Sequence, residues 1–311
     1  MPGESPLVTI GIAVYNGVDH ILQTLSSIDN QTYQNIEIVI VDDGSKDNSF
    51  EICMNWQQES SFPIAVYKNN SNLRLPATRN VLLKKASGKY LCLFDQDDMM
   101  MPGKIESDVL LFEAQKNNVA LIYSDLNLMD EKEKPIGNGY FERIGFKGRE
   151  NDDLFKELIK INFIPAPSVM VRTDLLKKVG GYDESLQFDD WDIWLRLAKE
   201  YEFVYSNVIN VFYRIHNSSM MANKNNEQSI LRNKANMKMF EKHVGLNNDY
   251  DEALYKKLKE LSVYSYFLGD KDSRRILGNY LKKKFDPKIW FYHKMALLGI
   301  RHSSAGFKKT G

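Results

Sequence analysis

Three aspartates lie within four positions, directly after an apolar run, in the segment YLCLFDQDD at residues 90–98. Two carboxylates about 5 Å apart repel by roughly 3 kcal/mol at an effective dielectric of about 20, so Asp95, Asp97 and Asp98 need a nearby cation or shared protons. Side chains two positions apart on an extended chain point the same way, which directs Asp95 and Asp97 to one site. Convergent carboxylates suit a hard divalent cation, Mg²⁺ or Mn²⁺, bound together with substrate phosphates.

A second acidic group lies nearly a hundred residues further on, in FDDWDIW. Asp189, Asp190 and Asp192 open a segment with helical periodicity, where the helix dipole favours acids, so capping explains at least one of them. Three acids beside Trp191 and Trp194 exceed what a cap needs. We therefore regard this group as a source of a general base as well as a helix cap.

Further polar and charged side chains lie near the ends of other predicted elements. Asp42 and Asp43 of DDGS can accept from the imide of a uracil or thymine and from hydroxyls, although a turn with an acid capping the next helix is an equal alternative. Arg74 and Arg79 could hold a diphosphate, and the alternative is a solvated helix face. His216, just after a strand, is either structural or a third protein ligand of the predicted metal.

The first hundred residues alternate between β-rich and helical patterns. These patterns predict strands at 7–16, 36–45, 62–70 and 89–94, and helices at 18–28, 47–59 and 76–86. Strands that are apolar on both faces and separated by helices indicate an α/β fold, a mostly parallel sheet with helices on each side. Ligands of such sheets bind beyond the carboxyl ends of the strands, where Asn16, Asp42, Asp43 and the 95–98 cluster fall.

The remaining chain continues this alternation and then becomes helical. We predict helices at 102–117, 152–160 and 189–200 and another from Thr173, and strands at 119–124, 167–172, 202–206 and 208–214. The polar, Gly-containing segment 130–153 predicts a loop. We therefore expect two regions, a catalytic domain at 1–225 that contains the sheet and a helical region at 226–311 that is basic at its end.

Composition limits the class of protein. The 311 residues include 41 basic and 41 acidic side chains, a balance that argues against a general affinity for nucleic acid. Cys53 and Cys92 are too few for a disulfide framework or a zinc quartet. Because the N-terminus has no signal-sequence pattern and no stretch approaches the roughly 18 apolar residues of a membrane span, we expect a cytoplasmic protein.

The charge is uneven along the chain. Residues 281–311 contain eight Lys or Arg and one acid, a net charge of +7. Together with Trp290, Phe291, Tyr292 and MALLGI, this segment could lie peripherally on the anionic inner face of a membrane. The alternative is a helix that packs its apolar side on the domain or on a partner subunit.

With these segments in order, about residues 6–222 resemble the family 2 glycosyltransferases, which have the GT-A fold. The resemblance rests on VTIGIAVYN, QTYQNIEIVIVDDGSKDNS, ATRNVLLKKASGKYLCLFDQDD, VGGYDES, FDDWDIWLRLA and YRIHNSSM, in the family's order and at about its spacing. It implies an inverting transfer of a sugar from a nucleotide-diphosphate donor, with a UDP-sugar favoured, to the hydroxyl of a glycan or lipid-linked acceptor in cell-surface polysaccharide assembly. It also implies a divalent metal cofactor, Mn²⁺ or Mg²⁺.

The resemblance assigns several residues to the donor nucleotide. Asp42 and Asp43 match the acids that recognise the base. Val14 and Asn16, at the end of the first strand, are expected beside them. Arg79 matches the arginine that precedes the donor strand.

The metal ligands and the base match in the same way. Asp95 and Asp97 match the family's Asp-x-Asp, in which Asp97 is the more direct metal ligand and Asp95 also borders the nucleotide. His216 matches a histidine that approaches the metal or the diphosphate. Asp190 matches the second acid of the family's Glu-Asp pair, the catalytic base, and Asp189 stands at the position of the Glu.

Two positions depart from the family pattern. Arg74 stands where family members usually carry Gly, which affects the shape of the loop and its nucleotide contacts. Asp189 replaces the usual Glu, which makes it a second candidate for the base.

Three alternative functions were weighed. A sugar-phosphate nucleotidylyltransferase needs a Gly-rich, basic loop after the first strand, and a dinucleotide-dependent oxidoreductase needs Gly-x-Gly-x-x-Gly there. The segment AVYNGVDH has neither pattern. A catalytically inactive subunit that binds sugar nucleotides or acts as a scaffold is the third alternative, which only an assay distinguishes.

Overall fold

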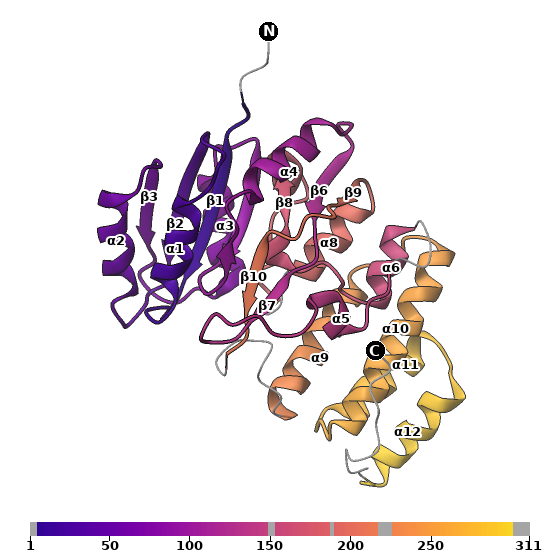
Figure 1. Ribbon diagram of the computed structural model, residues 1–311. Coiled ribbons are helices and arrows are strands. Elements are labelled where there is room, and N and C mark those ends of the chain that lie inside the picture. Colours follow the sequence, from indigo (N-terminus) through magenta and orange to yellow (C-terminus); the bar gives the residue numbers. More distant parts are fainter. Residues whose placement is uncertain (1–4, 149–152, 187–189, 217–225, 301–311) are drawn as a thin grey trace. The chain divides into compact units, whose positions relative to one another are not determined.

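The computed structural model describes residues 5–148, 153–186, 190–216 and 226–300 (Figure 1). The chain divides into two compact units. The first consists of Met1–Arg149, Asn162–Ser185 and Asp189–His216, and the second of Glu150–Ile161, Leu186–Phe188 and Asn217–Gly311. The boundary that the sequence suggests near residue 225 lies outside the described residues, and the helix at 154–160, expected in the first region, belongs to the second unit.

A seven-stranded sheet forms the centre of the first unit, in the order β3-β2-β1-β4-β8-β6-β9. Its strands are β1 (Val8–Val14), β2 (Ile36–Asp42), β3 (Ile64–Lys68), β4 (Tyr90–Asp95), β6 (Val119–Tyr123), β8 (Met170–Arg172) and β9 (Glu202–Tyr205). Strand β8 runs antiparallel to β4 and β6, whereas the other neighbouring pairs are parallel. The predicted mostly parallel sheet of an α/β fold is confirmed.

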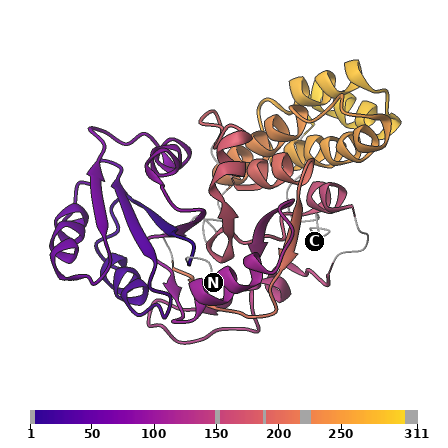
Figure 2. The same ribbon diagram turned by 90° about the horizontal axis from the view of Figure 1, so that it is seen from above.

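Helices cover both faces of this sheet (Figures 1 and 2). They are α1 (Ile21–Asp29), α2 (Ser49–Glu59), α3 (Leu75–Lys85) and α4 (Lys104–Glu113). Ile40 of β2 belongs to the large core that includes residues of α1, α2 and α4, whereas its neighbour Val41 packs with Leu82 of α3. Successive side chains of a strand point to opposite faces, so the consecutive apolar residues 38–41 of β2 serve two cores.

A second, three-stranded sheet in this unit has the order β5-β10-β7. Its strands are β5 (Met99–Met100), β7 (Asn127–Met129) and β10 (Val211–Arg214), and the remaining helical elements of the unit are α5 (Tyr140–Ile144), η1 (Ala166–Ser168), α7 (Thr173–Lys178) and α8 (Asp190–Ala198). The prediction of a continuous loop at 130–153 is wrong, because α5 forms within it. Gly139 and Gly145 flank α5 with φ of +116° and +73°, and the helix is too short to show a period.

The second unit is helical, as the C-terminal pattern predicts. Its helices are α6 (Leu154–Lys160), α9 (Asn226–Glu241), α10 (Asn248–Phe267), α11 (Ser273–Lys283) and α12 (Pro287–Leu297). The long helix α10 contacts each of the other four. Asp286 caps α12 by accepting from the N–H groups of Lys288 and Ile289. Among the described helices of either unit, none combines the length and the apolar character needed to cross a bilayer.

Candidate active site

The carboxyl ends of β2, β1 and β4 lie side by side in the large sheet. Val14 pairs with Asp42 and Ala13 pairs with Asp95 in the strand register. The Asp43 N–H also donates to the Val14 carbonyl, at 2.7 Å. Acids from two separate segments therefore meet at one edge of the sheet, where ligands of parallel sheets bind. The side chain of Val14 is buried in the core, so only its backbone borders this edge.

Asp42 organises the turn after β2. Its Oδ1 accepts from the N–H groups of Gly44 and Ser45, at 3.2 and 3.0 Å. Its Oδ2 is buried and has no hydrogen-bond partner among the residues that the structure describes. Because buried polar atoms normally have a partner, this oxygen is suited to accept from an N–H or hydroxyl group of a ligand.

Asp43 fastens the loop 69–74 to the same turn. Its Oδ1 accepts from Asn69 Nδ2 and from the Leu73 N–H, at 2.8 and 2.9 Å, and its Oδ2 accepts from the Arg74 N–H at 3.0 Å. Arg74 has φ +74° and ψ 158°, a conformation that favours glycine and costs other residues about 1–3 kcal/mol. The departure from the family's Gly at this position therefore places an arginine in a strained backbone, which the carboxylate of Asp43 helps to hold.

Asn16 joins the end of β1 to the turn after β2. Its φ of +48° lies in the left-handed region that asparagine tolerates. Its N–H donates to Ser45 Oγ at 3.0 Å, and its Oδ1 accepts from the Lys46 N–H at 2.9 Å. The preceding Tyr15 N–H donates to Gln96 Oε1 at 2.9 Å, which ties β1 to the acidic segment after β4.

Arg79 of α3 faces Asp95 at the end of β4. Its Nη2 donates to Asp95 Oδ1 at 3.1 Å. Burial raises the pKa of Asp95, the Arg79 guanidinium opposes this shift, and the negative charges of Asp97 and Asp190 add to it, so that the net direction is upward. Since the charge of Asp190 acts on Asp95 together with that of Asp97, acids from two distant segments of the chain share one electrostatic environment.

His216 follows β10 and contacts Asp97, with 2.8 Å between Nε2 and Oδ2. This hydrogen bond raises the pKa of His216 against the opposing effect of burial. His20, just before α1, has its ring centroid 5.1 Å from that of His216. Burial lowers the pKa of His20, and the positive charge of Arg214 lowers it further. Sequence reasoning missed His20, because a single histidine before a helix forms no pattern.

Asp190 is the first residue of α8, and Asp189 lies outside the described residues. Asp190 Oδ2 accepts from Asn162 Nδ2 at 3.3 Å, and its Oδ1 accepts from the N–H of Trp191 at 2.9 Å. Burial raises the pKa of Tyr140 on α5, and the charge of Asp190 raises it further. Neither Asn162 nor Tyr140 belongs to a sequence motif, so only the fold reveals that they lie near the acid.

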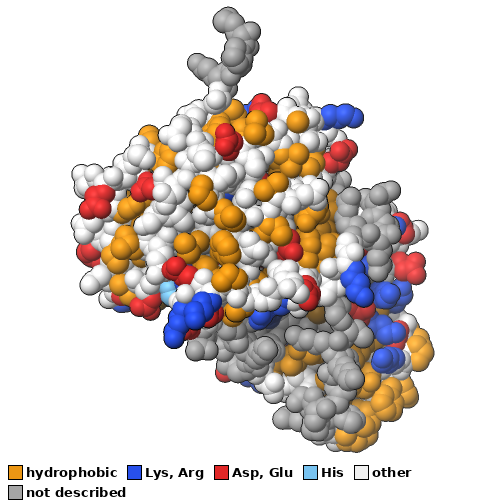
Figure 3. All heavy atoms as spheres, in the orientation of Figure 1, with side chains coloured by type: hydrophobic (Ala, Val, Ile, Leu, Met, Phe, Trp, Pro, Cys, Tyr) orange, Lys and Arg blue, Asp and Glu red, His pale blue; other side chains and the backbone are white. Residues whose placement is uncertain are grey.

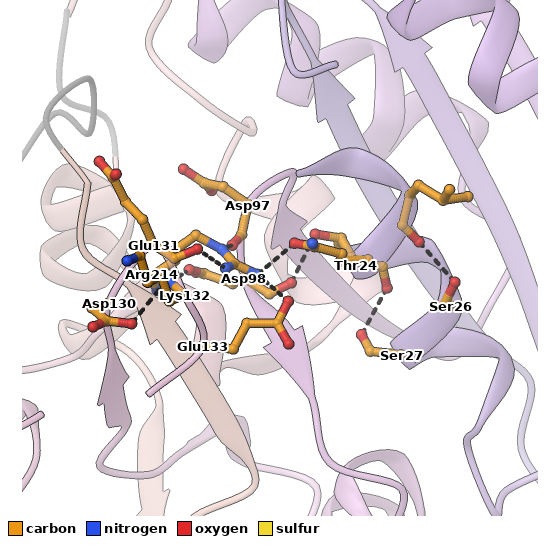
Figure 4. Close-up of polar contacts among 12 residues, drawn as sticks. Thr24, Ser26, Ser27, Asp97, Asp98, Asp130, Glu131, Lys132, Glu133 and Arg214 are labelled. Carbon is orange, nitrogen blue, oxygen red and sulfur yellow. Dashed lines mark hydrogen bonds and ion pairs between the residues drawn. The ribbon is translucent and has the colours of Figure 1, made fainter. Parts of the chain in front are cut away.

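Arg214, the last residue of β10, holds the turn that carries Asp97 and Asp98 (Figure 4). Its backbone N–H donates to Asp98 Oδ1 at 2.9 Å, and its Nε donates to the Asp97 carbonyl at 2.8 Å. Its Nη2 donates to Gln23 Oε1 at 2.9 Å and lies 3.6 Å from Glu133 Oε1. The Arg214 side chain is completely buried, so these partners replace its entire hydration.

The carboxylate of Asp98 serves this turn and not the helix that follows it. Asp98 accepts from the Arg214 N–H, and α4 begins after Gly103 without a side-chain cap. Burial, followed by the charges of Asp97 and Asp95, raises the pKa of Asp98 well above its usual value. Sequence reasoning missed Arg214, although it stands two positions before His216, the spacing of one strand face.

The donor atoms at this edge fit a hard divalent cation that a ligand helps to bind. Asp95 and Asp97 supply carboxylate oxygens and His216 an imidazole, and Mn²⁺ accepts both types. Within the described parts of the chain, no group of three or more His, Cys, Asp or Glu side chains is arranged to hold a metal unaided. Such ions often use one or two carboxylates and complete their shell with substrate phosphates. The raised pKa values of Asp95 and Asp98 reflect an excess of acid that a cation would offset.

Comparison with protein families identifies the class. The family described as "Glycosyl transferase family 2" matches residues 9–180, more than half of the chain. The chain belongs to this family, and the resemblance predicted from its motifs is confirmed.

Two curated relatives illustrate the range of similarity. The UDP-Glc:alpha-D-GlcNAc-diphosphoundecaprenol beta-1,3-glucosyltransferase WfaP of Escherichia coli is 31% identical over 225 residues, which are 70% of this chain and 81% of that protein. An uncharacterized glycosyltransferase of Rickettsia typhi is 28% identical over 216 residues, 69% of this chain and 65% of that protein. The match thus spans slightly less than two thirds of the Rickettsia relative.

Solved structures share the fold. TarS of S. aureus superposes with a TM-score of 0.65 at 15% identity, covering 98% of this chain and 56% of TarS. The mannosyltransferase PcManGT from Pyrobaculum calidifontis, solved in complex with GDP-Man and Mn²⁺, gives a TM-score of 0.63 at 15% identity, covering 96% of this chain and 82% of that one. The GT-A fold predicted from the sequence is therefore confirmed.

Proposed function

We propose that this protein is an inverting glycosyltransferase that moves a sugar from a nucleotide diphosphate to an acceptor hydroxyl. The observation that carries the proposal is the electrostatic environment that Asp95 and Asp97, at the carboxyl end of β4, share with Asp190, the first residue of α8. Two of these acids, with a cation, would meet the donor diphosphate, and the third would meet the acceptor. Membership of the glycosyl transferase family supports this division of roles.

Asp190 is the proposed general base. Its Oδ2 accepts a long hydrogen bond from Asn162, at 3.3 Å. Because the asparagine amide is uncharged, this contact orients the carboxylate without neutralising it. The acceptor hydroxyl would attack the anomeric carbon from the face opposite the diphosphate and pass its proton to Asp190, a contribution of about 10²–10⁴-fold in rate. Asp189 is the second candidate for the base.

The proposed donor side combines the ends of β1 and β2 with Arg79 of α3. Asp42 and Asp43 would recognise the base through the carboxylates that shape the turn after β2, with Val14 and Asn16 bordering it. Arg79, held against Asp95, would offer charge-assisted hydrogen bonds to the diphosphate.

The proposed metal ligands come from the ends of two other strands, β4 and β10. Asp95, Asp97 and His216 would hold Mn²⁺ or Mg²⁺, which when bound stabilises negative charge on the leaving diphosphate. His216 has to release its contact with Asp97 to become a ligand.

The proposed donor is a UDP-sugar and the proposed acceptor is a lipid-linked glycan. TarS, which shares the fold, has been solved with UDP-GlcNAc. The relative WfaP is named for UDP-Glc as donor and a diphosphoundecaprenol-linked sugar as acceptor. The TarS complex supports a UDP-sugar as donor, and WfaP supports a lipid-linked acceptor of the kind used in cell-surface polysaccharide assembly. The sugar itself is left to the assay.

A donor screen tests this function. Purified protein is incubated with Mn²⁺ and UDP-, GDP- and dTDP-sugars, release of the nucleoside diphosphate is measured, and the anomeric configuration of the transferred sugar is read by NMR. We expect release from one UDP-sugar and a product of inverted configuration. A product of retained configuration contradicts the inverting mechanism, and tight donor binding without hydrolysis or transfer would favour the inactive, scaffold-type alternative.

A further inference from the structure

Helix α11 has an apolar face and a basic face. Ile276, Leu277 and Tyr280 are buried. Four exposed cations line a cavity beside this helix. Lys271 precedes the helix, Arg274 and Arg275 lie in its first turn, and Lys282 lies near its end. Neither Arg274 nor Lys282 forms an ion pair with any residue in the described part of the chain. Uncompensated charge of this kind is available to a ligand outside the protein.

The basic face of α11 lines a cavity of about 560 Å³ that α12 closes on one side. Its remaining lining residues are Asp272, Gly278, Asn279, Leu281 and His293. Gly278 leaves room for His293, since a Cβ there would lie 3.2 Å from His293 Nε2. The one acid among these lining residues, Asp272, pairs with Lys234 at 2.6 Å and with Arg275 at 3.7 Å, which leaves Arg274 and Lys282 without an ion-pair partner among the described residues. The cavity therefore favours an anion and is large enough for a phosphate-bearing group.

Helix α12 and its flanks present large apolar side chains to solvent beside this cavity. The exposed fractions are 72% for Phe285, 49% for Trp290, 52% for Phe291 and 73% for Leu298. Trp290, His293 and Leu297 follow the spacing i, i+3, i+7, so the cavity-lining His293 shares a helix face with two exposed apolar residues. Figure 3 shows hydrophobic side chains gathered over this part of the second unit.

The two features together select one kind of partner. Residues 271–300 contain eight basic and two acidic side chains, a net charge of +6. Binding of free phosphate would explain the cations but not the exposed tryptophan and phenylalanines. Binding to an apolar protein groove would explain the aromatic side chains but not the cations. An anionic bilayer accounts for both, because aromatic rings favour the headgroup region and each basic residue near an anionic surface adds about fivefold to binding.

We propose that the α11–α12 surface, formed by the cavity and the exposed side chains of α12, docks on an anionic bilayer with a lipid phosphate in the cavity. Trp290 and Phe291 would enter the headgroup region beside it. This docking does not depend on the transferase chemistry proposed above. It would hold the enzyme at the membrane that carries a lipid-linked acceptor.

Vesicle co-sedimentation of the full chain tests the proposal. Phosphatidylcholine vesicles with phosphatidylglycerol should bind the protein, and pure phosphatidylcholine vesicles should bind it much less. The variant Arg274→Gln/Arg275→Gln should weaken binding by about 25-fold, at about fivefold for each charge. Trp290→Ser/Phe291→Ser should also weaken it. The matched control Lys84→Gln/Lys116→Gln removes two exposed charges of the first unit and should leave binding unchanged.

Two further measurements separate the alternatives. Binding of inorganic phosphate, measured by calorimetry, that depends on Arg274 and Arg275 without any vesicle binding would overturn the bilayer proposal in favour of a soluble anion. Self-association in sedimentation velocity that Trp290→Ser/Phe291→Ser abolishes, again without vesicle binding, would overturn it in favour of a protein interface. Each variant should keep wild-type donor hydrolysis, so a failure of docking is distinct from a failure of the transferase function.

Discussion

The strand-end acids of the first unit and the α11–α12 surface of the second carry opposite charges. The two regions also differ in whether those charges have partners within the protein. Each of three clustered aspartates contacts a basic residue. Asp95 contacts the Arg79 guanidinium and Asp97 the His216 ring, whereas Asp98 accepts from the backbone N–H of Arg214. On α11, Arg274 and Lys282 have no ion-pair partner among the described residues. The acids are partly compensated within the unit, although the pKa values of Asp95 and Asp98 remain raised, whereas these two bases have no ion-pair partner among the described residues.

The backbone differs in the same sense. The described non-glycine residues with positive φ are Asn16, Arg74 and Glu133, and all three contact groups that support the strand-end acids. Helices α11 and α12 contain no such residue within their described lengths. Backbone strain persists where the surroundings impose one geometry. Among the described non-glycine residues, this strain therefore lies around the strand-end acids, as a small ligand held in a fixed position would require.

Removing divalent metal should produce the largest effect on the acidic region. Because the bound cation contributes several kcal/mol at a diphosphate, we expect excess chelator to reduce transfer by about a thousandfold or more. Isothermal titration calorimetry should show donor binding lost in parallel and restored by Mn²⁺. Full activity in chelator would contradict the metal assignment to Asp95, Asp97 and His216. Vesicle binding by the α11–α12 surface should not change.

The substitution Asp190→Asn should separate chemistry from donor binding. Loss of the general base predicts a decrease in kcat of about 10²–10⁴-fold, with the Kd for the donor close to the wild-type value. Single-turnover kinetics and calorimetry measure the two quantities. Near wild-type turnover would move the base elsewhere, and Asp189→Asn would be the next variant to examine.

Replacing Arg214 tests whether internal compensation matters. Arg214→Lys removes the Nε bond to the Asp97 carbonyl and the fork toward Gln23. Changing a residue that orients metal ligands typically lowers metal affinity or activity about 10- to 100-fold. We expect a decrease of about that size in apparent Mn²⁺ affinity and in activity. A titration of activity against Mn²⁺ concentration measures the apparent affinity. The titration is done well below the melting temperature, so that any loss of stability does not contribute. Arg172→Lys, at an exposed ion pair with Asp174, is the matched control and should behave as wild type.

Arg74→Gly should give the smallest effect, and it should stabilise the protein where the other changes impair function. It relieves a positive φ that costs about 1–3 kcal/mol, partly offset by the greater freedom of glycine in the unfolded chain. We expect the free energy of unfolding to rise by about 1 kcal/mol in urea titrations. Ser71→Gly, three residues earlier and without positive φ, should instead lower it. A decrease for Arg74→Gly would mean that its side chain stabilises the loop more than its backbone strains it.

The sequence alone determined the family, the GT-A fold and the strand ends at which the acids fall. These features are local: apolar runs define the strands, turn residues end them, and parallel strands put their carboxyl ends at one edge. The predicted mostly parallel sheet is confirmed, and Asp42, Asp95, Asp97 and Asp190 emerge at its edge or near it.

Tertiary structure alone decided which residues support these acids. Arg214, His20 and Asn162 act through contacts between segments far apart in the chain, and no periodicity records such a contact. The same holds for α5, which Gly139 and Gly145 flank, and for the cavity beside α11. Local sequence fixes where a strand begins and ends, but the compensation of a buried charge depends on whichever side chain the finished fold brings within a few ångströms.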